Sequence, residues 1–217
     1  MKKEEVLKAI KEARKQNKKR NFTQTAELIV ALKDLDLKKP ENQVELYVTL
    51  PEGLGKEIKI AGIVSPDMLE EAKKHFDLVL VEEDLEKYRK NKRLGKKLAR
   101  SYDYFVAAAP LMPKIAAAIG RYLGPLGRLP SPRAGTIIAS KQQIPMLADK
   151  LRKTVRIIVK KQPQAQVRVG VESMSDEALA RNIETVYNQL IHHLPREEQN
   201  VKHVYFKFTM SKPVRVV

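Results

Sequence analysis

The spacing of hydrophobic residues changes twice along the 217-residue chain, which predicts three successive regions. In the first region, apolar residues between Val6 and Ala13 recur at helical intervals and predict an amphipathic helix. Segments 26–32 and 44–50 are rich in strand-forming residues. Because residues 38–42 between them have turn chemistry, we expect the two segments to form an antiparallel hairpin.

The second region, residues 54–154, alternates apolar strands with helices over short connections. Such alternation is typical of a parallel sheet built through right-handed crossovers. A continuous apolar run such as 78–81 is the kind of strand that a parallel sheet buries on both faces. The expected strands are 58–64, 78–81 and 104–109, and the expected helices are 66–76, 87–100, 112–123 and 144–153.

The last third of the chain returns to alternating strands around one amphipathic helix. The expected strands are 155–159, 166–171 and 201–209, and the helix begins at the N-cap Ser175. We therefore predict an α+β domain formed by both chain ends, residues 1–53 plus 155–217. An inserted three-layer α/β domain with a parallel, Rossmann-like sheet, residues 54–154, interrupts it.

The charge balance of the chain points to a polyanionic partner. There are 42 Lys and Arg against 26 Asp and Glu, a net charge of +16, and nucleic acid is the usual partner of so basic a protein. No apolar run reaches the roughly 18 residues of a membrane span, and the first residues do not resemble a signal peptide. We expect a cytoplasmic protein with no membrane partner. Because Cys is absent, disulfides, thiolate zinc sites and thiol catalysis are excluded.

No motif in the sequence forms a complete catalytic or cofactor site. Gly53 and Gly55 lack the third glycine of a dinucleotide fingerprint, and no Gly-Lys-Ser/Thr closes a phosphate loop. The four His are scattered, so neither a metal site nor a catalytic triad is indicated. We expect no cofactor and no metal, and the chain is predicted not to be an enzyme. An enzyme with a nucleotide site in the α/β domain is the competing hypothesis from a different class.

Two segments of the α/β region carry most of the chemistry. Residues 87–100 hold eight basic residues and no acidic one, which is typical either of a solvated helix face or of a surface that neutralises phosphates. Residues 124–135 contain three Gly, three Pro and two Arg, which favours either a rigid connection or an Arg-bearing surface held against a phosphodiester backbone. The predicted basic surface of this domain comprises Lys92, Arg93, Lys96, Lys97, Arg128 and Arg133.

Residues 119–135 also form a long motif, Ile-Gly-Arg-Tyr-Leu-Gly-Pro-Leu-Gly-Arg-Leu-Pro-Ser-Pro-Arg-Ala-Gly. This motif resembles the signature of the ribosomal protein L-one family of the large subunit. Further blocks similar to those of the family follow in the same order, at residues 20–27, 50–56, 169–174 and 208–210. The length and the short N-terminal helix resemble the archaeal members. One departure lies at Ser211-Lys212, where the family usually has a single Gly before Pro.

The resemblance implies a structural protein of the large ribosomal subunit. Its first domain would bind large-subunit rRNA, and its second domain would be hinged near residues 53–56 and 154–156. The protein would form the mobile stalk beside the tRNA exit site, contact the exit-site tRNA transiently and assist the release of deacylated tRNA. It would also repress translation of its own mRNA by binding an rRNA-like element, and it would be a monomer within the cytoplasmic ribosome.

Matched position by position, the resemblance also implies an RNA-binding surface on the first domain. Hydroxyls of Thr can bond to 2′-OH and phosphate groups, the Phe22 ring can face a ribose or base, and Glu27 can accept a hydrogen bond from a 2′-OH. Without the resemblance, Phe22 and Met210 would be interpreted as core residues and Glu27 as a solvated strand charge. A ribosome-associated or RNA-processing factor with the same fold but another contact surface is the nearest alternative. The implied residues are Phe22, Thr25, Glu27, Arg168, Gly170, Ser173, Thr209, Met210, Ser211 and Lys212.

Overall fold

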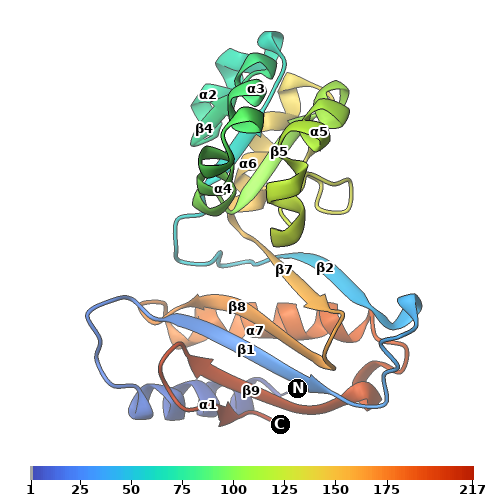
Figure 1. The fold of residues 1–217 in the computed structure, drawn as a ribbon. Helices are drawn as coiled ribbons and strands as arrows, with labels where there is room; N and C mark the ends of the chain where they lie inside the picture. Colours follow the sequence, from blue (N-terminus) through green and yellow to red (C-terminus); the bar gives the residue numbers. More distant parts are fainter. Residues whose placement is uncertain (1) are drawn as a thin grey trace. The chain divides into compact units, whose positions relative to one another are not determined.

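The computed structural model describes residues 2–217, which form two compact units (Figure 1). One unit combines the part of the chain up to Lys56 with Lys153–Val217, and the other consists of Glu57–Arg152. Each unit has its own sheets and its own buried hydrophobic residues. The first unit is antiparallel and the second is parallel, so the chain combines both kinds of β structure.

A four-stranded antiparallel sheet forms the centre of the first unit, in the order β10-β9-β1-β8. Two helices pack on one face of this sheet and leave the other face open (Figure 1). Every second side chain of β1, from Ala26 to Leu32, points inward and is buried. The strands are β1 (Thr25–Leu32), β8 (Gln164–Val171), β9 (Val201–Phe208) and β10 (Val214–Arg215), and the helices are α1 (Lys3–Gln16) and α7 (Asp176–Ile191).

The strands β2 (Val44–Thr49) and β7 (Thr154–Val159) form a separate two-stranded antiparallel sheet in the same unit. The predicted hairpin between 26–32 and 44–50 is therefore wrong, because β1 pairs with β8 and β9 while β2 pairs with β7. Local alternation and turn chemistry specify strands but do not choose their partners. A central strand such as β1 needs a neighbour on each side, and here both neighbours come from the last third of the chain.

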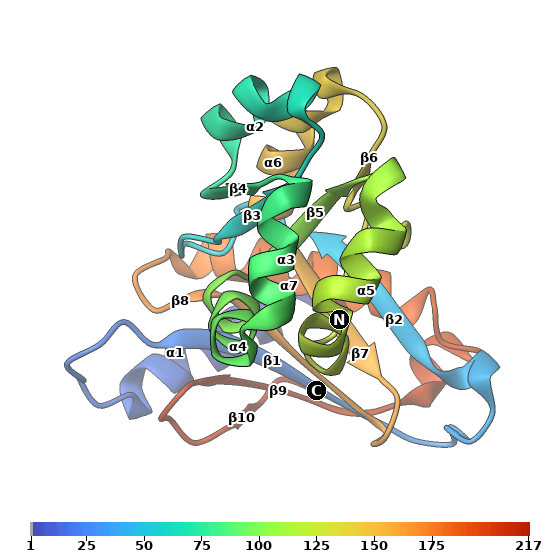
Figure 2. The ribbon, with the colours of Figure 1, turned by 45° about the horizontal axis from the view of Figure 1, so that its top comes forward.

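The second unit contains a four-stranded parallel sheet in the order β4-β3-β5-β6, which confirms the prediction of a parallel sheet. Its helices form two groups, α3 to α5 on one face and α2 with α6 on the other (Figure 2). The strands are β3 (Ile60–Ile63), β4 (Leu78–Leu80), β5 (Tyr104–Ala108) and β6 (Ile137–Ile138). The helices are α2 (Leu69–His75), α3 (Glu82–Lys90), α4 (Lys92–Ser101), α5 (Met112–Leu123) and α6 (Ile144–Arg152).

The predicted single helix over 87–100 is two helices, α3 and α4, which meet at Asn91. The Asn91 side-chain oxygen accepts hydrogen bonds from the backbone N–H groups of Arg93 and Leu94, at 3.1 and 3.2 Å. An Asn in this position ends one helix and caps the next. The eight basic residues are therefore divided between two helices.

Candidate nucleic-acid interface

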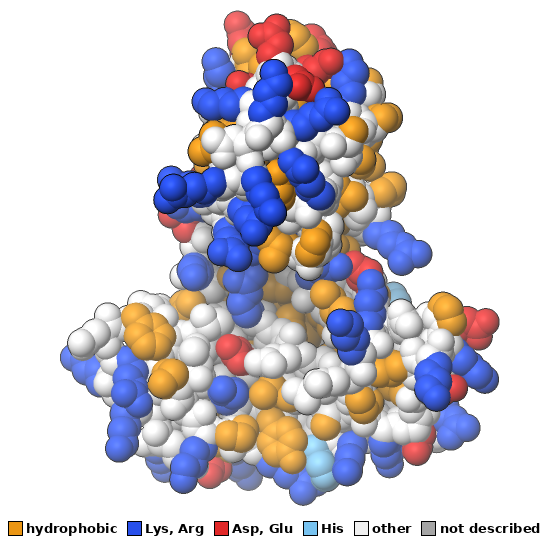
Figure 3. Space-filling model, viewed as in Figure 1, with side chains coloured by type: hydrophobic (Ala, Val, Ile, Leu, Met, Phe, Trp, Pro, Cys, Tyr) orange, Lys and Arg blue, Asp and Glu red, His pale blue; other side chains and the backbone are white. Residues whose placement is uncertain are grey.

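The open face of the first unit's sheet carries a row of charged side chains at one end. Glu27 on β1 lies between two cross-strand neighbours, Arg168 on β8 and Lys207 on β9. Gln166 donates a hydrogen bond of 2.8 Å to one carboxylate oxygen of Glu27, and among the described residues it is the only such donor. The second oxygen therefore keeps its lone pairs for an outside donor. Figure 3 views this open face, where charged side chains are few and Lys and Arg lie mainly along the rim.

Thr209 joins the end of β9 to the beginning of β1. Its backbone N–H donates to the Thr25 carbonyl at 3.0 Å, and its hydroxyl accepts from the Thr25 N–H at 3.1 Å. The same hydroxyl donates to the Thr25 carbonyl at 3.3 Å. Since a hydroxyl has one proton and two lone pairs, only one lone pair of Thr209 is left for a ligand. Thr209 can therefore accept a hydrogen bond from RNA, but it has no proton to give without breaking the Thr25 contact.

The turn after β9 shows how the chain tolerates Ser211 where a Gly is usual in the resembled family. The Ser211 hydroxyl accepts from the Phe208 N–H at 2.9 Å, and the Ser211 N–H donates to the Phe208 carbonyl at 3.0 Å. Among the described residues, the only non-glycine positions with positive φ are Asp34 and Glu197. Ser211 therefore adopts an ordinary backbone conformation, and its side chain closes the turn.

The two large apolar residues of the implied surface lie outside the core. Phe22 is 51% exposed and Met210 is 57% exposed, so their interpretation as core residues is wrong. Met210 is hydrogen-bonded through its N–H to a buried residue that the sequence did not single out, Gln24, and Phe22 precedes Gln24 by two positions. Exposed apolar side chains beside a fixed backbone are suited to contact with a ribose or base.

Gln24 is fully buried and joins three segments of the first unit. Its side-chain oxygen accepts from the Met210 N–H at 3.0 Å, and its amide nitrogen donates to the Asn17 side-chain oxygen at 2.8 Å. The backbone carbonyl of Gln24 accepts from the Glu172 N–H at 2.9 Å. The alternation of β1 continued backward places Gln24 on the inward face, and a polar residue there is the signal that could have identified it.

Gly170 lies near the end of β8 and Ser173 on the turn that follows, on either side of Glu172, whose N–H bonds to Gln24. A Cβ on Gly170 would come within 2.5 Å of Leu179 Cδ2 and 2.7 Å of Met174 Sδ. Close packing of β8 against α7 therefore explains the glycine at this position without any RNA contact. Ser173 is exposed on the turn after β8, and Arg14 holds that turn by donating to the Glu172 carbonyl at 2.7 Å.

In the second unit, five of the six predicted basic residues are exposed: Lys92, Arg93, Lys96, Lys97 and Arg133. The exception is Arg128, whose Nη1 donates to the carbonyls of Ala99 and Tyr102 at 2.8 and 2.6 Å. Arg128 thus holds the last carbonyls of α4 and is not a free surface cation. Figure 3 shows Lys and Arg side chains gathered over the face of this unit that carries α3 and α4.

Comparison with known proteins identifies the family. A model of the Ribosomal protein L1p/L10e family matches residues 11–212. The chain is 46% identical to the large ribosomal subunit protein uL1 of Thermococcus kodakarensis over 213 residues, 98% of this chain and 97% of that protein. It is 42% identical to the protein of the same name from Methanobrevibacter smithii, over 99% of both chains. This chain belongs to the ribosomal protein L1p/L10e family.

Membership of the L1p/L10e family makes the chain a structural protein and rejects the enzyme hypothesis. Among residues 2–217, no group of three or more His, Asp or Glu is arranged to hold a metal ion. None of the described helices is both long and apolar enough to cross a membrane.

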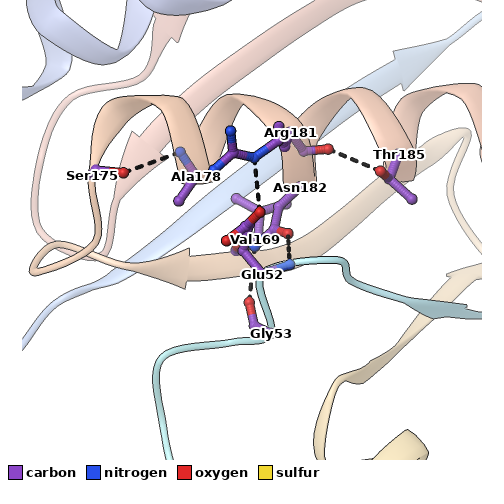
Figure 4. Close-up of polar contacts among 8 residues, drawn as sticks. All are labelled: Glu52, Gly53, Val169, Ser175, Ala178, Arg181, Asn182 and Thr185. Atoms are coloured by element: carbon purple, nitrogen blue, oxygen red, sulfur yellow. Dashed lines mark hydrogen bonds and ion pairs between the residues drawn. The ribbon is translucent and has the colours of Figure 1, made fainter.

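A second polar residue missed by sequence reasoning lies where the L1p/L10e chain leaves the first unit. Asn182 on α7 is fully buried and donates to the carbonyls of Gly53 and Val169, both at 2.8 Å (Figure 4). Its side-chain oxygen accepts from the Glu52 N–H at 3.1 Å. Asn182 interrupts the apolar face of α7, and a polar residue on such a face is the signal that could have identified it. Asn182 thereby joins residues 52–53, where the chain leaves the first unit, to β8.

Proposed function

We propose that this protein is a structural constituent of the large ribosomal subunit in the cytoplasm and binds large-subunit rRNA as a monomer within the ribosome. The observation that carries the proposal is the convergence of Phe22, Thr25, Thr209 and Met210 around buried Gln24. These residues come from opposite ends of the chain, and hydrogen bonds join the backbone of Thr209 to that of Thr25 and the backbone of Met210 to the Gln24 side chain. Family membership and the net charge of +16 support the same conclusion.

The chemistry of this surface suits structured RNA. The exposed Phe22 ring offers a face to a ribose or base, and the remaining lone pairs of Thr209 and Glu27 can accept from 2′-OH groups. Glu27 would otherwise repel phosphate, but it lies between Arg168 and Lys207, so the row as a whole remains attractive to RNA. Acceptors that select a 2′-OH and cations that attract phosphate give specificity and affinity together.

The two units have different roles. Residues 1–53 plus 155–217 act as the rRNA-binding domain, and residues 54–154 act as an inserted domain that carries Lys92, Arg93, Lys96, Lys97 and Arg133 toward RNA. The protein belongs to the mobile stalk beside the tRNA exit site, contacts exit-site tRNA and assists the release of deacylated tRNA. It represses translation of its own mRNA, because an mRNA element that mimics the rRNA would meet the same acceptors and cations.

The test compares single substitutions in equilibrium binding to an rRNA fragment from the stalk. We expect Thr209→Ala and Phe22→Ala each to weaken binding by about tenfold, which is within the roughly 1–3 kcal/mol of a specific contact. Thr209→Ser keeps the hydroxyl and is the matched control, with near wild-type affinity. Lys96→Ala should cost less affinity and should lower the salt dependence instead. Equal losses from Thr209→Ala and Lys96→Ala would refute the assignment of the surface.

Repression is tested separately, with an RNA that carries the leader of the protein's own mRNA. The leader should compete with the rRNA fragment for the wild-type protein, and Thr209→Ala should weaken both complexes by the same factor. A leader that binds no better than an unrelated RNA of equal length would remove repression from the proposal and leave rRNA binding in place.

A further inference from the structure

A hollow of about 490 Å³ lies in the first unit, between the end of α1 and the turn after β9. It is lined by Gln16, Lys18, Arg20, Met210, Ser211 and Lys212. We propose that this hollow binds a phosphate of the RNA backbone, with Lys18 and Arg20 as contact residues in addition to the surface described above. The inference rests on the proposed rRNA binding and extends the RNA path from Met210 onto the end of α1.

The lining of the hollow is positively charged. Three of the six lining residues, Lys18, Arg20 and Lys212, are cations, and none is an acid. Within residues 2–217, none of these three cations forms an ion pair with a carboxylate. Cations that share a hollow repel one another, so an anion bound between them is favoured over water.

Two carboxylates that contact the end of α1 are bonded to residues outside the lining of the hollow. Glu172 accepts from the Asn17 side chain at 3.1 Å, and Asp176 accepts from Arg14 at 2.6 Å. Neither carboxylate lines the hollow. Lys18, Arg20 and Lys212 therefore keep their charge available for a ligand.

The walls of the hollow are fixed in advance by Gln24. Its amide nitrogen donates to the Lys18 carbonyl at 3.3 Å as well as to Asn17, while its oxygen holds the Met210 N–H at 3.0 Å. One buried side chain thus spans from the wall that carries Lys18 to the wall that carries Met210. A preformed cradle binds more tightly than a flexible one, because less ordering is needed when the ligand arrives.

The hollow is larger than a water molecule needs, and its lining combines charged with apolar surface. A volume of about 490 Å³ lies in the ordinary range of ligand sites, about 300–1,000 Å³, and far exceeds a single water. The exposed thioether chain of Met210 lies beside the cations, so an apolar surface for a ribose or base adjoins the charged one. Figure 3 shows Lys and Arg side chains beside exposed hydrophobic ones at the end of the unit where the α1–β1 connection lies.

The experiment measures binding of the full chain to the stalk rRNA fragment across a salt titration. The test variant is Lys18→Gln with Lys212→Gln, and the control is Lys8→Gln with Lys11→Gln, an equal charge change on exposed positions of α1. The test variant should bind at least tenfold more weakly, and its log–log salt slope should fall by about 0.7–0.9 for each phosphate that it no longer neutralises. The control should lose less than threefold in affinity.

Neutral methylphosphonate substitutions, placed one at a time in the RNA, locate the bound phosphate. For the wild type, one position should weaken binding, and for the double variant the same substitution should have no further effect. If the double variant behaves like the control and no position distinguishes it from wild type, the phosphate site is refuted. Two single variants, Thr209→Ala and Arg20→Gln, distinguish rRNA binding from the phosphate site. If Thr209→Ala weakens binding and Arg20→Gln does not, rRNA binding stands and the phosphate site in the hollow is refuted.

Discussion

The substitution Gln24→Leu tests whether one buried amide organises the proposed RNA surface. Leu preserves the size of the side chain but removes both of its hydrogen-bonding atoms. Two well-formed bonds disappear, to Met210 N–H at 3.0 Å and to the Asn17 oxygen at 2.8 Å, together with a weaker one to the Lys18 carbonyl at 3.3 Å. At about 1 kcal/mol for each good bond, we expect the free energy of unfolding to fall by about 2 kcal/mol.

Amide hydrogen exchange is the appropriate assay because it reports on individual backbone groups. The Met210 N–H should exchange about 30-fold faster in Gln24→Leu, the equivalent of about 2 kcal/mol. The Thr209 N–H keeps its bond to the Thr25 carbonyl, so its exchange should be accelerated by no more than this factor. Affinity for the stalk rRNA fragment should fall by about tenfold, because Met210 and Lys18 are no longer held in place.

The control for this experiment is Gln199→Leu, an exposed glutamine in the same unit. It should leave both exchange and affinity unchanged. If Gln24→Leu keeps wild-type affinity while Met210 exchange is accelerated, preorganisation by Gln24 is refuted, since the backbone would then be free to move without any weakening of binding.

Interactions elsewhere in the chain also have measurable consequences. Arg128→Ala should lower the melting temperature of the second unit without changing the salt dependence of RNA binding. Arg133→Ala should reduce the salt dependence of RNA binding without lowering the melting temperature. The same result for both variants would contradict the internal role of Arg128. Gly170→Ala should destabilise the first unit by about 1–3 kcal/mol, because its Cβ would meet Leu179 at 2.5 Å, and a neutral effect in urea unfolding would refute that packing. The Lys160 and Arg156 side chains lower the pKa of Glu45. The contribution of the Glu45 carboxylate to the free energy of unfolding should therefore be fully present above pH 4.5, its ordinary pKa, and be lost as the pH falls through the lower pKa of the folded state. The difference in stability between the wild type and Glu45→Gln should shrink only in that acidic range, and a difference that stays constant with pH would contradict this role.

The sequence patterns predicted helices and strands better than they predicted which strands pair. Helix α5 spans Met112–Leu123 as expected, because apolar positions at helical spacing and Pro113 in the first turn specify it locally. Ser175 begins α7 by accepting from the Ala178 N–H at 3.2 Å, also a local signal. The hairpin prediction was wrong because β1 and β2 find their partners more than 100 residues away, and the pattern within a segment contains no information about such pairing.

Single polar residues in otherwise apolar patterns were the main features missed within the site. Gln24 and Asn182 each occupy a buried position, where a polar side chain is stable only if its neighbours satisfy it. Composition and motif spacing treat them as ordinary residues, and their bonds to Met210 and to Gly53 depend on tertiary structure. Arg128 shows the opposite error: an Arg in a loop was predicted to be a surface cation, but the carbonyls at the end of α4 bind it.

The central claim is that the first unit recognises a particular RNA structure and does not only attract phosphate. The most direct measurement is equilibrium binding of the full chain to the stalk rRNA fragment and to duplex RNA of equal length, each across the same salt titration. We predict that the rRNA fragment remains bound at salt concentrations that release the duplex, since hydrogen bonds to 2′-OH groups and apolar contacts persist when phosphate attraction is screened. Release of both RNAs over the same salt range would contradict the account, because charge alone would then explain binding.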